Sequence, residues 1–433
     1  MYRKCSTAEA DIGMRYYLSG ADGTGGRIKA EPEDFIVNEV SKHLDVSDGG
    51  KFVIAEVTSR NWETNRLVRM LSRSMGISRE RIGFAGTKDK RAVTTQLMSF
   101  EVPDGALEKI DLKDVSVRNA YRAKRGIQIG DLIGNSFEIT VKDCAMPAER
   151  IKETIDSVTS SVNALKGFPN YFGVQRFGTT RPITHLVGES LVRGRIKEAV
   201  DIYLSKVSEH EQQDVIGSRK LLADRSNLKD AVRTMPKTMS FEKMMAEHLI
   251  AYPGDDVGAI SKLPVNLQMM FTHAYQSYLF NVMLSMRMDA GIPLDRPVEG
   301  DVVIPVDANR TPMHERPAVV TSKNMSLAEK QVRSGKAFIT ISLFGAESTI
   351  SEGPMGEIER KVIDGEKLKK EDFMIPGLPH CSSKGSRREI VCPVNDIAAA
   401  VNDNGYTIKF YLPKGNYATC LLREYMKSEM TSY

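Results

Sequence analysis

The chain has 433 residues, of which 41% are hydrophobic and 27% are charged, a composition typical of globular proteins with two or three domains. Its formal net charge is only +4, so the overall charge does not predict a nucleic-acid binder, and positive charge has to be read locally. No apolar run reaches the roughly 18 residues of a membrane span, and the N-terminus lacks a signal-peptide core. The cysteines are dispersed with no CxxC pair, which argues against a disulfide framework and predicts a cytoplasmic protein. They are Cys5, Cys144, Cys381, Cys392 and Cys420.

A glycine-rich loop at residues 20–26 superficially resembles a dinucleotide-binding fingerprint. Pro32 and the β-favouring residues 35–37 follow it, and they exclude the helix that such a phosphate site requires. No GxxxxGK[ST] sequence occurs anywhere in the chain. The sequence therefore predicts no nucleotide cofactor.

The next predicted elements are a helix and a strand pair. We expect Thr64 to cap a helix. Its apolar face carries Leu67, Met70 and Leu71, at the i, i+3, i+4 spacing of a helix. Residues 81–84 and 92–102 are apolar or β-favouring and enclose a short polar stretch. This pattern predicts a strand, a tight turn and a second strand.

Asp89 is the only acid in that turn, where Lys88, Lys90 and Arg91 surround it. Nearby positive charge favours the ionised form of a carboxylate. An ionised carboxylate presented at a turn can act as a nucleophile on a sugar carbon, and the surrounding cations can attract a phosphate backbone. The alternative is a solvated hairpin tip, which is the more common role of a charged turn.

A compact basic stretch follows at residues 121–125. Arg122, Lys124 and Arg125 accompany Tyr121, a combination suited to phosphate contact. The alternative is a solvated basic turn.

Both ends of the chain contribute to one predicted sheet. Residues 136–143 and 406–412 alternate apolar and polar side chains as half-buried strands do, and residues 149–165 form a predicted helix. These elements predict an α+β fold with a mixed sheet.

A loop at residues 168–178 carries several aromatic side chains, an amide and Arg176 between glycines. Aromatic faces stack on flat bases and amides read base edges, which is how unpaired or flipped bases are recognised. The alternative is a packed loop whose aromatic rings fill the core.

The middle of the chain, residues 191–392, differs from both ends in its many methionines and charged loops. Tyr275, Leu279, Val282, Met283 and Met286 are spaced as a helical stripe that predicts core packing rather than a ligand site.

Metal binding is not predicted. The histidines never fall in HxxxH, HExxH or His/Cys ligand spacing, and no GxSxG nucleophile elbow occurs. The histidines of the chain are His43, His185, His210, His248, His273, His314 and His380.

Taken together, these windows resemble the tRNA pseudouridine synthase D (TruD) family, in its archaeal type. The resemblance rests on Lys29 with PEDF at 32–35, GFAGTKDKRAVT at 83–94, GNSF at 134–137, NYFGVQRFG at 170–178 and LPKGNYATCLLRE at 412–424. These motifs lie in order along nearly the whole chain.

The resemblance implies that Asp89 is the catalytic nucleophile, that Lys29 lies beside it, and that Asn170 and Phe172 contact the target base. Tyr417 stands where the family usually has Phe, so its contact with the base is less secure. The family fold is a mainly antiparallel catalytic domain with helices, interrupted by a second, α/β domain. We therefore expect a catalytic domain in residues 1–190 and 393–433 and an inserted domain in 191–392.

The implied reaction isomerises a uridine of tRNA, by family preference at position thirteen, to pseudouridine. The C1′–N1 bond breaks, the base rotates, and C1′ joins C5. This needs no redox change, and hence no cofactor or metal. A carboxylate can attack C1′ or remove a C2′ proton, and the sequence does not choose between them.

The competing interpretation is a non-catalytic RNA-binding or chaperone protein, for which basic and aromatic residues suffice. A third interpretation, an RNA methyltransferase, lacks support because no glycine-rich cofactor loop follows a strand and opens a helix in this chain. The oligomeric state stays open, with a monomer slightly favoured.

Overall fold

The computed structural model describes residues 2–308 and 310–433. Their contacts divide them into two compact units. The helical unit contains residues 2–17, 169–308, 310–391 and 429–431, and the sheet unit contains residues 18–168, 392–428 and 432–433. The chain passes from one unit to the other within β10 (Gly167–Pro169), β15 (Val391–Pro393) and η8 (Met430–Ser432).

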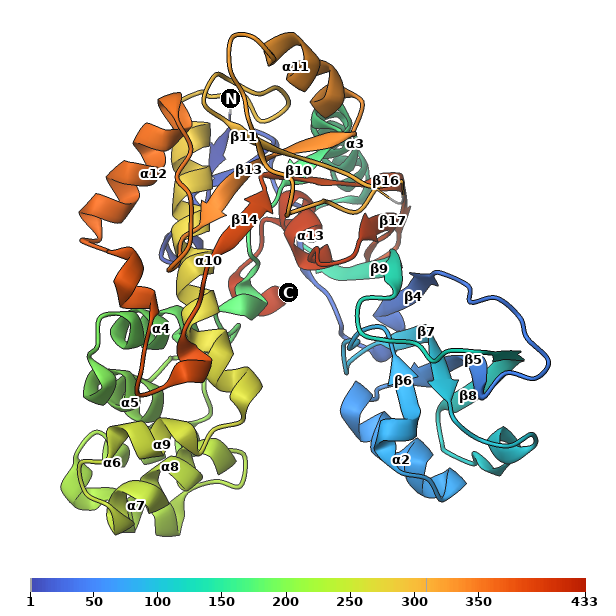
Figure 1. Cartoon of the computed structure of the whole chain (residues 1–433), viewed down its shortest axis with the longest axis vertical. Coiled ribbons are helices and arrows are strands. Elements are labelled where there is room, and N and C mark those ends of the chain that lie inside the picture. The colour runs from blue at the N-terminus through green and yellow to red at the C-terminus, as the bar shows by residue number, and fades with distance from the viewer. Residues whose placement is uncertain (1, 309) are drawn as a thin grey trace. The chain divides into compact units, whose positions relative to one another are not determined.

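The sheet unit is built on one large mixed sheet (Figure 1). Its strand order is β16-β17-β9-β4-β7-β5-β8, with β3 on β9 and β6 on β7. The pairs are antiparallel except β4 with β7. The strands are β3 (Gly25–Arg27), β4 (Phe35–Ser41), β5 (Phe52–Arg60), β6 (Ile82–Phe84), β7 (Val93–Phe100), β8 (Val115–Ala123), β9 (Leu132–Cys144), β16 (Asn395–Asn402) and β17 (Gly405–Pro413). The helices are η1 (Pro32–Asp34), α2 (Thr64–Met75), η2 (Arg79–Arg81), η3 (Ala106–Lys109), α3 (Ala148–Leu165) and α13 (Ala418–Met426).

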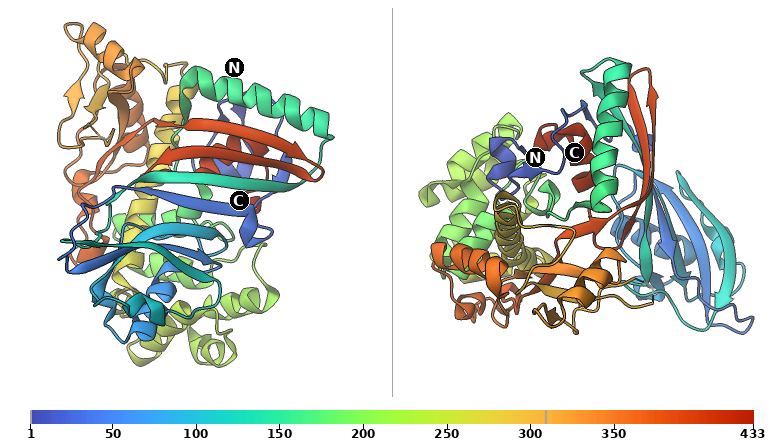
Figure 2. Two further views of the ribbon diagram at one scale, coloured as in Figure 1. Left: turned by 90° about the vertical axis from the view of Figure 1, so that its right-hand side faces the viewer. Right: turned by 90° about the horizontal axis from the view of Figure 1, so that it is seen from above.

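Alternating burial forms the core of this unit. Phe137, Ile139 and Val141 of β9 and the alternate residues of β17 face a shared core, as the two-residue period of a strand requires. The helix α3 packs on this face with apolar residues at helical spacing (Figure 2). The structure confirms the α+β fold class and the mixed sheet. It also confirms the predicted strands at 136–143 and 406–412 and the predicted helix at 149–165.

The predicted cap of the first long helix is wrong. Helix α2 begins at Thr64, but its N-cap is Glu63, whose carboxylate accepts the backbone N–H groups of Asn65 and Arg66. The Thr64 hydroxyl instead accepts the backbone N–H of Lys88, at 2.9 Å. A glutamate at this position reaches the orphan donors of the first turn, which leaves the threonine for the neighbouring loop.

The prediction of a tight turn around Asp89 is also wrong. Phe84 of β6 pairs with Met98, not with the first residues of β7. Val93 pairs with Ile36 of β4 on the same edge of β7, so β6 can only pair beyond that point. Residues 85–92 therefore form an open loop, which we call the aspartate loop, between β6 and β7.

In the helical unit, the long helix α10 packs against α4, α12 and β13 (Figure 1). The predicted stripe of α10 is core: Tyr275, Leu279, Val282 and Met283 are buried, and Met286 is half-buried. A four-stranded sheet has the order β12-β11-β13-β14. The strands are β1 (Arg3–Lys4), β2 (Tyr16–Tyr17), β11 (Val302–Pro305), β12 (Ala318–Val319), β13 (Ala337–Leu343) and β14 (Ser386–Glu389). The helices are α1 (Thr7–Ala10), η4 (Val174–Arg176), α4 (Thr184–Val192), α5 (Ile196–Ser205), α6 (Gln213–Leu222), η5 (Arg225–Asn227), α7 (Leu228–Thr234), α8 (Ser240–Ala251), α9 (Asp256–Ser261), α10 (Val265–Asp289), α11 (Met325–Arg333), α12 (Gly353–Gly365), η6 (Lys370–Phe373) and η7 (Pro379–Cys381).

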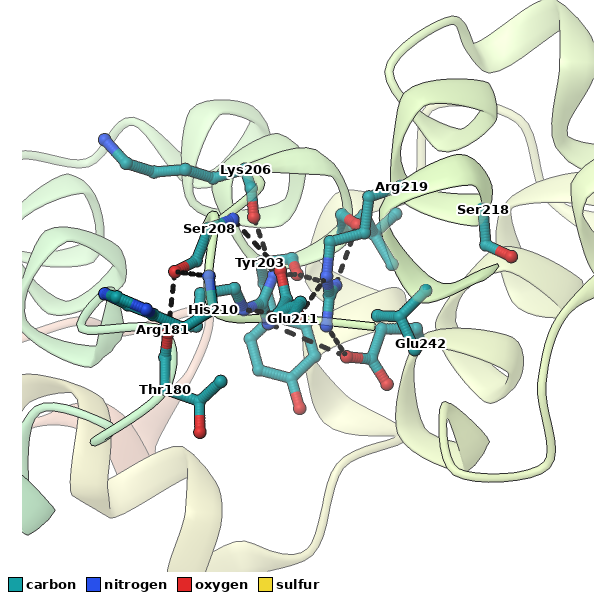
Figure 3. Close-up of polar contacts among 12 residues, drawn as sticks. Thr180, Arg181, Tyr203, Lys206, Ser208, His210, Glu211, Ser218, Arg219 and Glu242 are labelled. Atoms are coloured by element: carbon teal, nitrogen blue, oxygen red, sulfur yellow. Dashed lines mark hydrogen bonds and ion pairs between the residues drawn. The ribbon is translucent and has the colours of Figure 1, made fainter. Parts of the chain in front are cut away.

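A buried ion network lies among the helices of this unit (Figure 3). Arg219 donates to Glu211 at 2.8 Å and to Glu242 at 3.0 Å. Arg181 and Arg219 also donate to backbone carbonyls at the C-terminal end of α5. Burial lowers the pKa of the Arg181 guanidinium to about 10. Because its two cations meet two anions and the free carbonyls of a helix end, the network acts as a structural cap of α5.

Among residues 2–308 and 310–433, no helix is long and apolar enough to cross a membrane. The same residues contain no group of three His, Cys, Asp or Glu side chains that could hold a metal ion.

Candidate active site

Asp89 and Lys29 form the centre of the candidate site in the sheet unit. The Lys29 ammonium donates to a carboxylate oxygen of Asp89 at 3.0 Å. The lysine side chain is 18% exposed, whereas that of Asp89 is 50% exposed. The structure thus brings these two predicted residues together and leaves one side of the carboxylate open.

Lys29 is held in an unusual conformation. Its φ is +58°, in the left-handed region that costs a non-glycine residue about 1–3 kcal/mol and often marks functional sites. The Lys29 ammonium also lies 4.2 Å from the centre of the Phe35 ring, a favourable cation–π contact. The aromatic end of the PEDF motif therefore helps to hold the lysine beside Asp89.

The other cations of the aspartate loop do not surround Asp89 as the sequence suggested. Lys88 forms a buried ion pair with Glu39 of β4. Arg91 donates to the backbone carbonyl of Ala30 at 2.6 Å, and Lys90 is exposed. The charge beside Asp89 comes from Lys29, a residue 60 positions away, because the lysine next to it in sequence is turned into the protein.

Backbone hydrogen bonds hold the aspartate loop at its start and in its middle. Thr64 accepts the Lys88 N–H, as described above, and Ala85 accepts the N–H of Gly130 at 2.8 Å. The Lys414 ammonium donates to the Gly130 carbonyl at 2.9 Å. Gly130 thereby connects the loop before α13 to Ala85, at the start of the aspartate loop.

Tyr417 lies in that loop as the N-cap residue of α13, and its half-buried side chain packs on the core of the sheet unit. Its position at the loop's end, with the exposed Gly415 at φ +80° before it, is compatible with a ring near a substrate.

The basic patch is largely paired within the protein. Arg122 donates to Asp104 at 2.6 Å and to the Val102 carbonyl at 2.9 Å. Arg125 donates to Asp131 at 2.7 Å, and this hydrogen bond lowers the pKa of that carboxyl. Lys124 is exposed. Two of the three predicted phosphate contacts thus already have acidic partners.

The aromatic loop lies in the helical unit, where Asn170 is almost fully buried, at 3% exposure. Its amide nitrogen donates to the Glu389 carbonyl at 3.0 Å, and its amide oxygen accepts from Arg388 at 2.6 Å. Both ends of the amide are therefore satisfied by the protein in this structure.

Phe172 is also buried, at 6% exposure. The Arg388 guanidinium lies 4.1 Å and the Arg176 guanidinium 5.6 Å from the centre of its ring. Phe280 meets the same ring edge-on, at 5.5 Å between centres. The structure brings Asn170, Phe172 and Arg176 into one cluster, as the motif predicts.

The scaffold of this cluster is a polar stripe on α10 that the sequence reasoning missed. Asn281 accepts the Phe172 N–H at 2.8 Å and donates to its carbonyl at 3.0 Å. Ser285 bonds the Tyr171 hydroxyl and Ser277 accepts from Arg176. Polar residues at i, i+4 and i+8 on an otherwise apolar helix were a usable signal, since buried polar groups need partners.

Comparisons with known proteins define the class of this chain. A family model described as tRNA pseudouridine synthase D (TruD) matches residues 11–425. A Methanosarcina mazei protein named as a tRNA pseudouridine synthase D is 39% identical over 426 residues, covering 97% of each chain. A similarly named protein of Archaeoglobus fulgidus is 36% identical over 428 residues, covering 98% of this chain and 100% of its own.

The structural comparison agrees. A crystal structure of a Methanosarcina mazei protein, named as a tRNA pseudouridine synthase D, is 38% identical, with a TM-score of 0.88 and full coverage of both chains. The chain is thus an isomerase of the pseudouridine synthase class. It belongs to the tRNA pseudouridine synthase D (TruD) family.

Proposed function

We propose that this protein converts a uridine of tRNA to pseudouridine, at position thirteen. The observation that carries the proposal is the Asp89–Lys29 pair, in which a half-exposed carboxylate is held at 3.0 Å from a largely buried ammonium. Membership of the TruD family supports the substrate class. The sheet unit supplies this pair, which supports the predicted catalytic domain in the terminal parts of the chain.

The proposed role of Asp89 is to break the bond between C1′ and N1 of the target uridine. As a nucleophile, its carboxylate adds to C1′ while the bonding pair leaves with N1 of uracil. As a base, it removes the C2′ proton and the same pair leaves with N1. In either route the base rotates before C5 bonds to C1′. In the nucleophilic route C5 displaces the Asp89 carboxylate from C1′. In the base route Asp89 returns the proton to C2′ as C5 bonds to C1′. The C5 proton then goes to solvent and N1 takes up a proton. The product is an isomer of the substrate.

Lys29 is proposed to offset charge at the carboxylate during this step. Its ammonium is already in place in the free protein, fixed by the left-handed backbone and by the Phe35 ring. A preorganised charge costs no reorganisation at the moment of reaction.

The remaining predicted residues are proposed to hold the RNA. Asn170, Phe172 and Tyr417 retain the detached uracil, for which stacking and edge contacts suit a flat base. Arg176 supports Phe172, and Lys124 contacts the phosphate backbone. Arg122 and Arg125, which the sequence also suggested for phosphate contact, are paired with Asp104 and Asp131. The roles of Asn170, Phe172 and Tyr417 follow the family motifs, and the role of Lys124 follows from the basic stretch in which it lies.

The test is tritium release from tRNA that carries uridine labelled at C5, with the purified protein and no added cofactor. Release in proportion to turnover supports the proposal, because C5 loses its hydrogen only when C1′ joins it. Binding of the same tRNA without release would favour the alternative of a non-catalytic RNA-binding protein.

A further inference from the structure

Arg388 is the residue that connects the two halves of the aromatic cluster. It lies on β14, where its neighbour in the pairing is Ile341 of β13. Its guanidinium donates to the side-chain oxygen of Asn170 at 2.6 Å and to the Asn170 backbone carbonyl at 3.2 Å. The same group lies over the Phe172 ring. No motif of the sequence pointed to it.

The hydrogen bonds of Arg388 determine how Asn170 is oriented. An amide side chain can be turned over to exchange its oxygen and nitrogen. Here the oxygen faces a donor that has no acceptor capacity, and the nitrogen faces the Glu389 carbonyl. The reversed orientation would place N–H groups against a cation and an oxygen against an oxygen. Only one orientation of the Asn170 amide is therefore compatible with Arg388.

The stacking of Arg388 determines the position of Phe172. A guanidinium within about 6 Å of a ring centre is held by the ring's negative face, and Phe280 fixes the edge of the same ring. A planar fork can donate to an amide and stack on a ring at once, which a lysine ammonium does not reproduce.

The side chain of the neighbouring Arg387 does not take part in this arrangement. Side chains alternate along a strand, and Arg387 points into a buried pair with Glu359 and donates to Thr340. Arg387 is a structural residue, whereas Arg388 faces the family's base-contacting motif.

We propose that Arg388 is the positioning residue that fixes the Asn170 amide and the Phe172 ring for the substrate base. This inference rests on the proposed function of that motif. It assigns to β14, more than 200 positions from Asn170, the control of how the detached uracil is held.

The test compares Arg388→Met and Arg388→Lys with Arg233→Met, a change at an arginine on α7 whose side chain is 81% exposed. The first readout is hydrogen exchange of the backbone amides in residues 169–177 of the free, full-length protein. Both Arg388 variants should speed that exchange at least tenfold, and the Arg233 variant should not. Unchanged exchange in both Arg388 variants would overturn the inference without reference to activity.

The second readout is the single-turnover rate with tRNA, measured beside the dissociation constant. Arg388→Met should lower the rate at least tenfold and weaken binding less than about threefold, and Arg388→Lys should rescue little. In an Asn170→Ala background, adding Arg388→Met should cost less than about twofold more, because both changes remove one arrangement.

Three results would contradict this assignment. A wild-type rate in both Arg388 variants shows that the base is held without Arg388. A weaker dissociation constant with a flatter salt dependence makes Arg388 a phosphate contact. A fully additive loss in the Asn170→Ala background separates the two residues. If the wild-type protein itself releases no tritium, the proposed function fails, and hydrogen exchange still decides whether Arg388 fixes the loop.

Discussion

The buried ion pair between Lys88 and Glu39 gives a quantitative prediction for the aspartate loop. The side chains are 5% and 0% exposed respectively. Removing one partner of such a pair leaves an uncompensated buried charge, which costs about 3–5 kcal/mol. Glu39→Leu should therefore lower the folding equilibrium constant of the sheet unit at least about a hundredfold, since 1.36 kcal/mol is a factor of ten.

The double variant Glu39→Leu/Lys88→Met separates charge from packing. Replacing both partners by apolar residues of similar size is often neutral for stability. We therefore expect the double variant to lie within about 1 kcal/mol of the wild type. Glu153→Ala is the control, because its partner Arg150 and Glu153 itself are 62% and 65% exposed, and such surface pairs contribute less than about 1 kcal/mol.

The assay is urea unfolding followed by tryptophan fluorescence. The chain has a single tryptophan, Trp62, which lies in the sheet unit beside α2. Its fluorescence therefore reports the unit that contains the pair. A loss below about 1 kcal/mol in Glu39→Leu, or a double variant as unstable as the single one, would refute the buried-charge reasoning.

Three further predictions concern the substrate surface and the helical unit. Lys124→Ala should lower the log–log salt slope of tRNA binding by about 0.7–0.9. Adding Arg122→Ala and Arg125→Ala should change the slope little more, because Asp104 and Asp131 already neutralise these arginines. An equal drop in slope for each of the three changes would refute this reasoning. Burial lowers the pKa of His185 to about 4 from its ordinary 6.5. Between these values the unfolded chain binds a proton that the folded chain does not, so stability should fall by up to about 3 kcal/mol as pH falls, and His185→Phe should remove that slope in urea titrations. Tyr417→Phe should keep the wild-type single-turnover rate if the ring alone acts; a tenfold drop would show that the hydroxyl is needed.

The elements that the sequence predicted well are those with a strong local period. Apolar and polar side chains alternate around Phe137 and Ile408, and apolar residues follow helical spacing in 149–165. These patterns depend only on neighbours in the chain, so β9, β17 and α3 could be predicted from the sequence. The same holds for the core stripe of α10.

The errors came from contacts between distant segments. The aspartate loop is open because β4 occupies the edge of β7 that a tight hairpin would use. Lys88 is turned away from Asp89 because Glu39 lies under it, 49 positions earlier in the chain. Arg388 was missed because its partner Asn170 is 218 positions away. No local pattern encodes such pairs, although the chemistry of each is ordinary once the residues meet.

The central claim is that the Asp89 carboxylate performs the isomerisation. The most direct measurement is pseudouridine formation in tRNA by Asp89→Asn, mapped by carbodiimide adducts and compared with wild type and with Lys29→Met. The amide is nearly isosteric but is neither a nucleophile nor a base. We predict no product with Asp89→Asn and tRNA binding within a few-fold of wild type, and a lower rate with Lys29→Met at similar affinity. Turnover retained by Asp89→Asn would contradict the account.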